Sequence, residues 1–326
     1  MLSILTPAFN EADNLEALHT QMVTTMTTLG EEWEWLIVDD HSRDATFSVI
    51  ERIAARDPHV RGIRLARNSG SHVAIACGLH HVRGDAAVMM AADLQDPPAM
   101  LGAMRDRWRE GATVVWATRR ESPGSRSHGL FARFYYWIMR NVVGMRDMPA
   151  RGADFFLIDR IVIEGLRRFR ERNVSVLALV TWLGFRQVQI EYDKQPRAAG
   201  KSGWTLQKKI KLVLDSVIGF SDAPIRMCSY LGVVLFLLGV LVGIYAMVAP
   251  ASTTPWLVAV MVVLSGVNLM ALGLVGEYVW RGLDEARARP AYLIEALAGI
   301  HEPASFDQEF GGREAIQARQ PASTRY

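Results

Sequence analysis

Acidic and amide side chains recur in short polar runs that each follow an apolar run. Asp39 and Asp40 follow one apolar run, and Asp93 and Gln95 stand on alternate positions after another. A carboxylate accepts hydrogen bonds, so the first pair can bind a ribose diol or the imide N–H of uracil. Two oxygen ligands on alternate residues of an extended segment can face one hard cation that also touches a diphosphate.

Each pattern also has a purely structural interpretation. Acidic residues after strands are common in turns and helix caps, and Asp44 could cap the helix that follows the first pair. The second pattern could likewise be a polar turn ahead of Pro97 and Pro98. Because each pattern follows the strand of a repeated strand–helix unit, the two would meet at one edge of a sheet, which favours a ligand site.

The elements that must position these residues are visible up to about residue 118, where short apolar runs alternate with helical periodicity. The pattern predicts strands at 2–5, 34–38, 60–66, 85–91 and 112–117, and helices at 15–29, 45–55, 72–82 and 100–110. Repeated units of this length predict an α/β fold with a mostly parallel, Rossmann-like sheet covered on both faces. The less regular middle segment contains a predicted aromatic helix at 131–143 and a strand at 154–158.

The C-terminal third has a different composition. Residues 227–276 contain no Asp, Glu, Lys or Arg, and the apolar runs 227–249 and 256–280 are each long enough to cross about 30 Å of hydrocarbon. We therefore predict two transmembrane helices joined by a short uncharged connection. Basic residues flank both runs on the outer sides, which predicts that both termini are cytoplasmic; they are Lys208, Lys209, Lys211, Arg226, Arg281, Arg287 and Arg289.

The expected organisation is an α/β domain over 1–200, a basic amphipathic juxtamembrane segment over 201–225, a transmembrane hairpin over 226–281 and a cytoplasmic tail over 282–326 whose end is disordered. We therefore expect a multi-pass protein of the inner membrane. The formal net charge of +2 gives no basic footprint for nucleic-acid binding. The sequence also lacks the glycine-rich dinucleotide and P-loop motifs and the signatures of metalloproteases and serine hydrolases.

Several motifs in order resemble family 2 glycosyltransferases of the GT-A fold. They are LSILTPAFNEADNL at 2–15, VDDHSRDAT at 38–46, RNSGSHVAIACGLHHVRG at 67–84 and DLQDPP at 93–98. Within that family, DFFLIDR at 154–160, RAAGKS at 197–202 and the apolar hairpin resemble the polyprenyl-phosphate glycosyltransferases. That subgroup includes the dolichol-phosphate mannose synthases and the bacterial undecaprenyl-phosphate glucosyltransferases. The resemblance extends to about residue 300.

The resemblance implies roles for individual residues. Asp93 and Gln95 match ligands of Mg²⁺ or Mn²⁺, and Asp93 also faces the nucleotide sugar, although Ala91 replaces the first acid of the usual Asp-x-Asp. Asp154 matches the acid near the reacting centre, and Arg119 a basic residue that meets the diphosphate or the acceptor phosphate. The remaining matches are to nucleotide-binding positions, at Pro7, Phe9, Glu11, Val38, Asp39 and Asp40, and to the pair that faces lipid phosphate, at Arg197 and Lys201.

The function that the resemblance implies is inverting transfer of a sugar from a nucleotide sugar, with UDP favoured, to polyprenyl phosphate on the cytoplasmic membrane face. The product would serve cell-envelope glycosylation, and relatives imply a homotetramer. A metal would stabilise the leaving diphosphate, and the acceptor phosphate is already largely dianionic at neutral pH. Asp154 could therefore orient the acceptor or act as a base. Two alternatives are a polysaccharide synthase of the same fold and a non-catalytic membrane subunit that binds sugar nucleotide or lipid phosphate.

Overall fold

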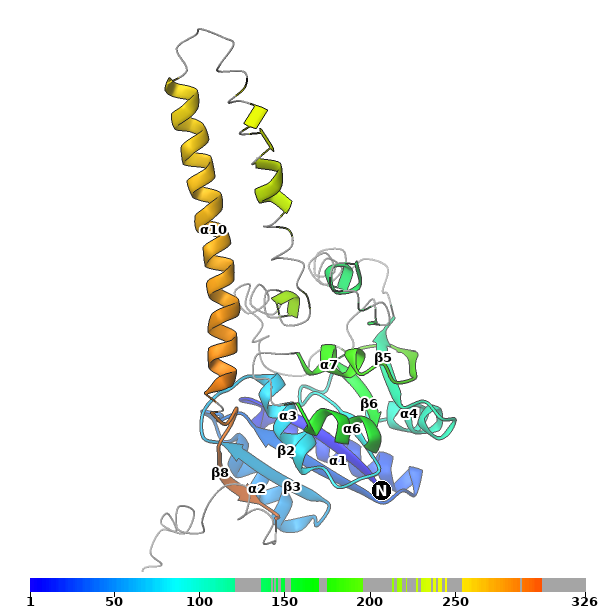
Figure 1. The fold of residues 1–326 in the computed structure, drawn as a ribbon. Helices are drawn as coiled ribbons and strands as arrows, with labels where there is room; N and C mark the ends of the chain where they lie inside the picture. Colours follow the sequence, from blue (N-terminus) through cyan, green and yellow to red (C-terminus); the bar gives the residue numbers. More distant parts are fainter. Residues whose placement is uncertain are drawn as a thin grey trace, which may run out of the picture. The chain divides into compact units, whose positions relative to one another are not determined.

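The computed structural model of the chain describes residues 1–120, 154–169, 175–195, 254–287 and 289–300, with scattered residues between 136 and 149 and between 213 and 244. The chain divides into two compact units (Figure 1). The first unit comprises Met1–Arg133, Asp147–Gly203 and Pro290–Tyr326, and the second comprises Phe134–Arg146 and Trp204–Arg289.

A single sheet organises the first unit. Among the described residues it has eight strands in the order β7-β5-β6-β4-β1-β2-β3-β8. The strands are β1 (Leu2–Ala8), β2 (Trp33–Asp39), β3 (Val60–Leu65), β4 (Ala86–Met89), β5 (Val114–Arg119), β6 (Phe155–Asp159), β7 (Gln187–Tyr192) and β8 (Ile294–Ala298).

Strand direction decides which residues share an edge of the sheet. β6 runs antiparallel to β4 and β5, and β8 runs antiparallel to β3, whereas the other paired strands are parallel. The amino ends of β6 and β8 therefore lie at the same edge as the carboxyl ends of the parallel strands. The predicted α/β fold with a mostly parallel sheet is confirmed, and the two antiparallel strands are additions to it.

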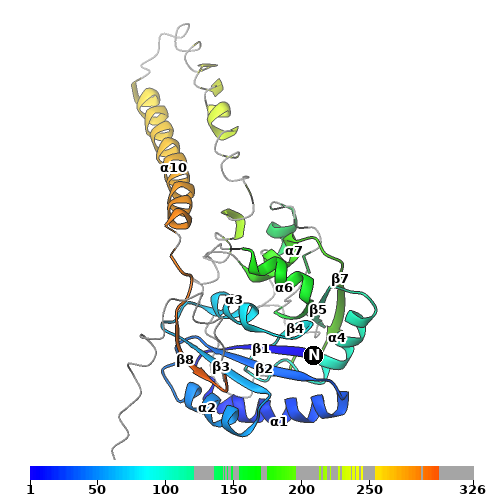
Figure 2. The same cartoon turned by 60° about the horizontal axis from the view of Figure 1, so that its bottom comes forward.

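Helices cover both faces of the sheet, with α1 and α2 on one side and α3 and α6 on the other (Figure 2). Buried side chains of α1, α2 and α4 form one continuous core with Ile4, Trp35 and Val88 of the strands. On the opposite face α3 lies so close to β1 that a Cβ on Gly78 would stand 2.1 Å from Leu5. The helices are α1 (Ala12–Leu29), α2 (Thr46–Arg56), α3 (Ser71–His81), α4 (Met100–Arg109), α6 (Arg160–Arg167) and α7 (Val176–Trp182).

The first strand is longer than its apolar run indicated, since β1 continues through Pro7 to Ala8. A proline has no N–H for a ladder, so it is tolerated only where no partner strand needs that donor. Pairing of β1 with β4 ends at Leu5, whose carbonyl accepts the Met90 N–H at 3.0 Å. The Pro7 nitrogen therefore falls where that ladder has already stopped.

The second unit contains the long helix α10 (Thr254–Ala286). Within it, Val263–Asp284 is the one stretch of the described residues that is long and apolar enough to cross a membrane. The predicted second span, 256–280, falls within α10. The predicted first span at 227–249 and the juxtamembrane segment lie largely outside the described residues. After α10 the chain supplies β8, an edge strand of the first unit, in a region that the sequence pattern assigned to a tail.

Candidate active site

Asp40 follows β2 directly, and both of its carboxylate oxygens accept hydrogen bonds from backbone N–H groups. Its Oδ1 accepts the N–H of Ser69 at 2.7 Å and its Oδ2 accepts the N–H of Gly70 at 2.8 Å. Gly70 has a φ of 94°, a conformation that favours glycine, and it precedes α3. Burial raises the pKa of Asp40, while the two donors oppose that shift. Asp40 thus fixes the loop that leads from β3 into α3.

Asp39, the last residue of β2, is differently placed. Its side chain is fully buried, and Oδ1 accepts the Ser42 N–H at 2.9 Å. Oδ2 lies 3.3 Å from Nη1 of Arg64 but has no hydrogen bond within the described part of the chain. Burial raises the pKa of Asp39. Buried carboxylate oxygens are nearly always hydrogen-bonded, so Oδ2 is an acceptor suited to a ligand.

The loops after β1 and β2 are joined to each other. The Asn10 N–H donates to Oγ of Ser42, and Oδ1 of Asn10 accepts the Arg43 N–H, both at 2.9 Å. Oδ1 of Asp44 accepts the N–H of Thr46 at 3.0 Å, at the start of α2. The N-cap of α2 is Ala45, which makes no side-chain cap, so the prediction that Asp44 caps this helix is wrong. Asp44 stands one residue earlier and accepts the Thr46 N–H from there.

The other predicted nucleotide residues line the same two strand ends. Pro7 of β1 is in register with Val38 of β2. Phe9 follows β1 with its side chain exposed. Glu11 stands immediately before α1 and accepts the Asn14 side-chain amide at 2.6 Å. The structure therefore brings these four residues together with Asp39 and Asp40.

Backbone strain is concentrated at this edge. In the described residues, three that are not glycine have positive φ: Asn10 at 57°, His41 at 58° and Leu94 at 61°. They follow β1, β2 and β4 respectively. Asparagine tolerates this conformation, but for leucine it is unusual. Strained residues of this kind cluster at functional sites, and here they mark the loops that carry the predicted chemistry.

Asp93 and Gln95 belong to the loop after β4. The buried Asp93 accepts the Gln95 N–H at 3.2 Å through Oδ1. The Gln95 amide nitrogen donates to the carbonyl of Gln195 at 3.2 Å, so its amide oxygen is left, among the described residues, as an acceptor. One carboxylate and one amide oxygen fit Mg²⁺ or Mn²⁺, which take further oxygens from phosphates and water. No group of three or more His, Cys, Asp or Glu within the described residues could hold a metal unaided.

A cluster of charged side chains, with Asp96 buried, Lys194 largely buried and Asp154 exposed, lies beside that loop. Nζ of Lys194 is 3.4 Å from Oδ1 of Asp96 and 3.2 Å from Oδ2 of Asp154. The Tyr192 hydroxyl donates to the same Asp96 oxygen at 2.6 Å. Burial raises the pKa of Asp96 against the effect of Lys194. Burial alone would lower the pKa of Lys194, but Asp154 and Asp96 outweigh it and raise that pKa.

The topology explains how this cluster forms. Asp154 precedes β6, and because β6 is antiparallel its amino end lies at the edge where β7 delivers Lys194. Arg119 ends β5 with its side chain exposed, in register with Tyr192 of β7. Arg197 and Lys201 lie outside the described residues.

Sequence reasoning missed five residues that the structure adds to this edge. Asp96 was visible in the DLQDPP motif, and Lys194 stands three residues before the RAAGKS motif at 197–202. Arg64 was visible, with Arg61, as one of two charges inside the predicted strand 60–66. Tyr192 carried no signal of its own, and neither did Glu295, which belongs to β8.

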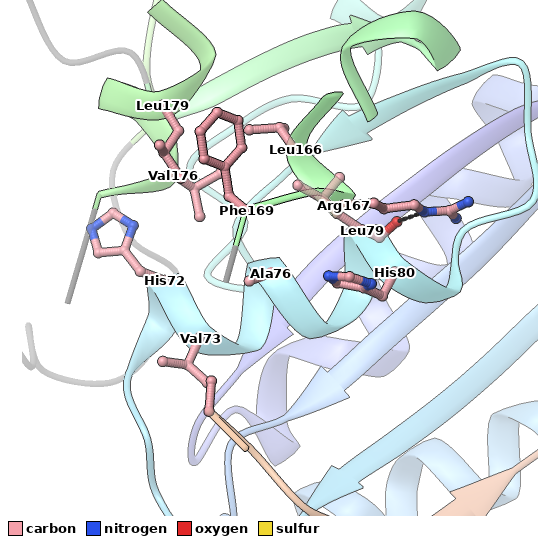
Figure 3. Close-up of a pocket in the computed structure, with 11 residues that line it drawn as sticks. His72, Val73, Ala76, Leu79, His80, Leu166, Arg167, Phe169, Val176 and Leu179 are labelled. Carbon is pink, nitrogen blue, oxygen red and sulfur yellow. Dashed lines mark hydrogen bonds between the residues drawn. The ribbon is translucent and has the colours of Figure 1, made fainter. Parts of the chain in front are cut away.

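A separate pocket lies between α3, α6 and α7 (Figure 3). It is lined mostly by apolar side chains, and none of the predicted site residues is among them. Arg167 closes one side, where Nε donates to the Leu79 carbonyl at 3.0 Å. His72 opens α3 at the other side, and its Nδ1 is buried without a hydrogen bond in the described part of the chain.

The mostly parallel sheet, with acidic loops at its carboxyl edge, is that of a GT-A glycosyltransferase. The chain matches glycosyl transferase family 2 over residues 3–167 and the GtrB C-terminal hairpin over residues 223–281. The chain therefore belongs to glycosyl transferase family 2, and the resemblance drawn from its motifs is confirmed.

Full-length relatives agree with this assignment. The chain is 33% identical over 305 residues to the uncharacterized glycosyltransferase YkcC of Bacillus subtilis (strain 168), covering 91% of this chain and 94% of that protein. It is 33% identical over 306 residues to the uncharacterized glycosyltransferase sll0501 of Synechocystis, covering 92% and 96%. It is 30% identical over 302 residues to the bactoprenol glucosyl transferase of Shigella phage SfX, covering 90% and 99%.

Proposed function

We propose that the protein transfers a sugar, with glucose as first candidate, from a UDP-sugar to polyprenyl phosphate, with inversion at the anomeric carbon. The reaction would occur on the cytoplasmic face of the inner membrane and supply polyprenyl-phosphate-sugar for cell-envelope glycosylation. One observation carries the proposal. The similarity to a bactoprenol glucosyl transferase covers 99% of that protein, so it includes both the sheet domain and the hairpin.

The two acids at the carboxyl end of β2, Asp39 and Asp40, support a nucleotide site. We assign the buried Oδ2 of Asp39 to a hydrogen bond from the uracil imide or a ribose hydroxyl, because a ligand donor would satisfy an oxygen that has no hydrogen bond to any described residue. Asp40 acts indirectly by fixing the loop before α3. The exposed ring of Phe9, two residues after Pro7, offers an apolar face to the base.

Asp93 and Gln95 are the residues that would hold Mg²⁺ or Mn²⁺. A bound divalent cation supplies Lewis-acid stabilisation of the leaving diphosphate. The chain contributes one carboxylate and one amide oxygen, a donor set that leaves room for two phosphates and water. The hydrogen bond from the Gln95 N–H to Asp93 keeps the two proposed metal ligands of this loop together.

The acceptor end of the site is built around Lys194. Asp154, paired with Lys194 at 3.2 Å, is suited to orient the acceptor. A phosphomonoester with a second pKa near 6 is already largely dianionic at pH 7, so it attacks the anomeric carbon without a general base. Arg119 adds positive charge at the end of β5, and the resemblance adds Arg197 and Lys201. Held cations reduce the repulsion between two anionic reactants, and a single displacement inverts the configuration.

The proposed organisation is that of the sequence analysis, with the sheet domain over 1–200 followed by a juxtamembrane segment and a hairpin over 226–281. Basic residues on the outer flanks of both apolar runs support a cytoplasmic site by the positive-inside rule. We expect a homotetramer, as the family resemblance implies. A lipid phosphate held in the cytoplasmic leaflet would then reach the site from the membrane surface.

The test is sugar transfer by purified protein from a panel of radiolabelled UDP- and GDP-sugars to undecaprenyl phosphate with Mg²⁺ or Mn²⁺. We expect label from one UDP-sugar to enter the organic phase and to be lost with a chelator. Asp93→Asn should abolish transfer, whereas Asp106→Asn, an exposed carboxylate paired with Arg105 on α4, should leave it unchanged. Lipid label from a GDP-sugar alone would overturn the UDP assignment.

The same panel separates the alternatives. A polysaccharide synthase would incorporate label into polymer, with none in a lipid monophosphate. A binding subunit would retain nucleotide while transferring no sugar from any donor.

A further inference from the structure

Glu295 of β8 reaches the nucleotide end of the sheet although 231 residues separate it from its partner Arg64. We propose that Glu295 is a positioning residue for the nucleotide: it holds the Arg64 guanidinium so that Asp39 keeps an acceptor oxygen available to the base or ribose. This inference rests on the proposed function, because it takes Asp39 as the nucleoside acceptor.

The Arg64 guanidinium lies among three oxygen acceptors, which belong to Glu295, Ser42 and Asp39. Its Nε donates to Oε2 of Glu295 at 3.0 Å, and its Nη2 donates to the Ser42 carbonyl at 3.1 Å. Its Nη1 approaches Oδ2 of Asp39 to 3.3 Å without forming a hydrogen bond. The charge of Arg64 therefore compensates the buried Asp39 carboxylate while leaving its Oδ2 lone pairs for another donor.

Without Glu295, Arg64 would no longer leave Oδ2 of Asp39 available to a ligand. An arginine and a carboxylate prefer a two-pronged hydrogen-bonded pair. If Nε were released, the guanidinium could rotate to donate twice to Asp39. That pairing would occupy the oxygen that the nucleoside needs, so nucleotide would have to displace an internal ion pair before binding. Glu295 prevents this by holding Nε on the opposite side.

The backbone of β8 at Glu295 is irregular in a way that can aim this side chain toward Arg64. β8 pairs with β3 through Arg64 and Ala296 and through Leu65 and Ile294, and the register shifts between these pairs. Glu295 is the residue of β8 that falls between these two pairs. Bulges re-aim side chains and recur next to functional sites. The same Oε2 lies 3.2 Å from Nδ1 of His41, the strained residue two positions after Asp39.

The experiment measures UDP binding by calorimetry, and donor kinetics, on the full-length protein in detergent with Mn²⁺. For Glu295→Gln we expect UDP affinity to fall about tenfold, the size of effect that loss of one charge-assisted contact gives. The donor KM should rise by a similar factor, while kcat at saturating donor stays within about twofold. Glu110→Gln, an exposed acid paired with Arg107, is the matched control and should bind UDP as the wild type does.

A purely structural role for Glu295 gives a different result. It would lower the melting temperature and leave the UDP affinity and donor KM of the folded protein unchanged, which would overturn the inference. Should Glu295→Gln not fold, Arg64→Lys tests the same point, because lysine keeps the charge but cannot bridge Glu295, Ser42 and Asp39 together. Several-fold weaker UDP binding is expected, and unchanged binding would overturn the inference.

Asp39→Asn separates a failure of the role inferred for Glu295 from a failure of the proposed nucleotide site. If Asp39→Asn weakens UDP binding and Glu295→Gln does not, the nucleotide site stands and only the role of β8 is wrong. If neither variant weakens UDP binding, the assignment of Asp39 in the proposed function fails, and the inference fails with it.

Discussion

Gln95 and Gln195 are joined by two hydrogen bonds across 100 residues of sequence. The Gln195 N–H donates to the Gln95 carbonyl at 2.9 Å, and the Gln95 side-chain amide donates to the Gln195 carbonyl at 3.2 Å. The first loop carries Asp93, and the second leads from Lys194 toward Arg197. The loops proposed to hold the metal and the acceptor are therefore physically tied, and a change in one should be felt in the other.

Gln95→Ala tests this tie. The variant loses an oxygen donor of the proposed metal site and one of the two hydrogen bonds to Gln195. We expect the Mn²⁺ concentration for half-maximal activity to rise about tenfold, within the range seen when metal-site partners are removed. The KM for lipid acceptor should rise as well, measured at saturating Mn²⁺. Gln21→Ala, on the exposed side of α1, is the control. A change in metal dependence with an unaltered acceptor KM would show that the metal loop and the acceptor loop are not functionally coupled.

Lys194→Met should destabilise the protein strongly. Asp96 is fully buried, and the variant would leave it without the cation at 3.4 Å. Breaking a buried pair in this way costs about 3 kcal/mol or more. Asp154→Asn removes the exposed partner of the same lysine, so it should change the unfolding free energy by less than about 1 kcal/mol. Thermal unfolding of the two variants measures the contrast, and equal losses would refute it.

His72 predicts an acid-sensitive contribution to stability. Burial lowers its pKa from 6.5 to about 4. Both states are neutral above pH 6.5, but between pH 6.5 and 4 the unfolded chain binds a proton that the folded chain does not, so stability falls as pH falls. The loss at pH 5 is about 2 kcal/mol at most. His72→Gln should remove this dependence in thermal unfolding at pH 5 and pH 8, whereas the exposed His80→Gln should retain it. Identical pH profiles for wild type and His72→Gln would contradict the assignment.

The sequence predicted those parts of the fold and site that depend on local pattern. The apolar runs located β1 to β6 within a few residues, because burial on both faces of a sheet leaves a local apolar signal. Asp39 and Asp93 were found for the same reason, since each follows such a run, whereas Asp154 was identified through the resemblance to known glycosyltransferases. Pro7 was the exception, because whether a proline ends a strand depends on the neighbouring ladder.

The remainder depends on contacts between distant segments. Nothing near Glu295 in sequence shows that it pairs with Arg64, because that contact exists only once β8 has added to the far edge of the sheet. Lys194 likewise gains its two carboxylates only because β6 runs antiparallel to its neighbours. Strand direction and edge pairing are properties of the assembled sheet, so periodicity along the chain does not encode them.

The most direct test of the central claim uses a UDP-sugar labelled separately in the sugar and in the β-phosphate, with undecaprenyl phosphate in liposomes and the purified protein. Glycosyl transfer breaks the bond between the anomeric carbon and the phosphate oxygen. Our account therefore predicts that the sugar label enters the lipid phase while the phosphate label stays in water as UDP. Both labels in the lipid, or neither, would contradict it.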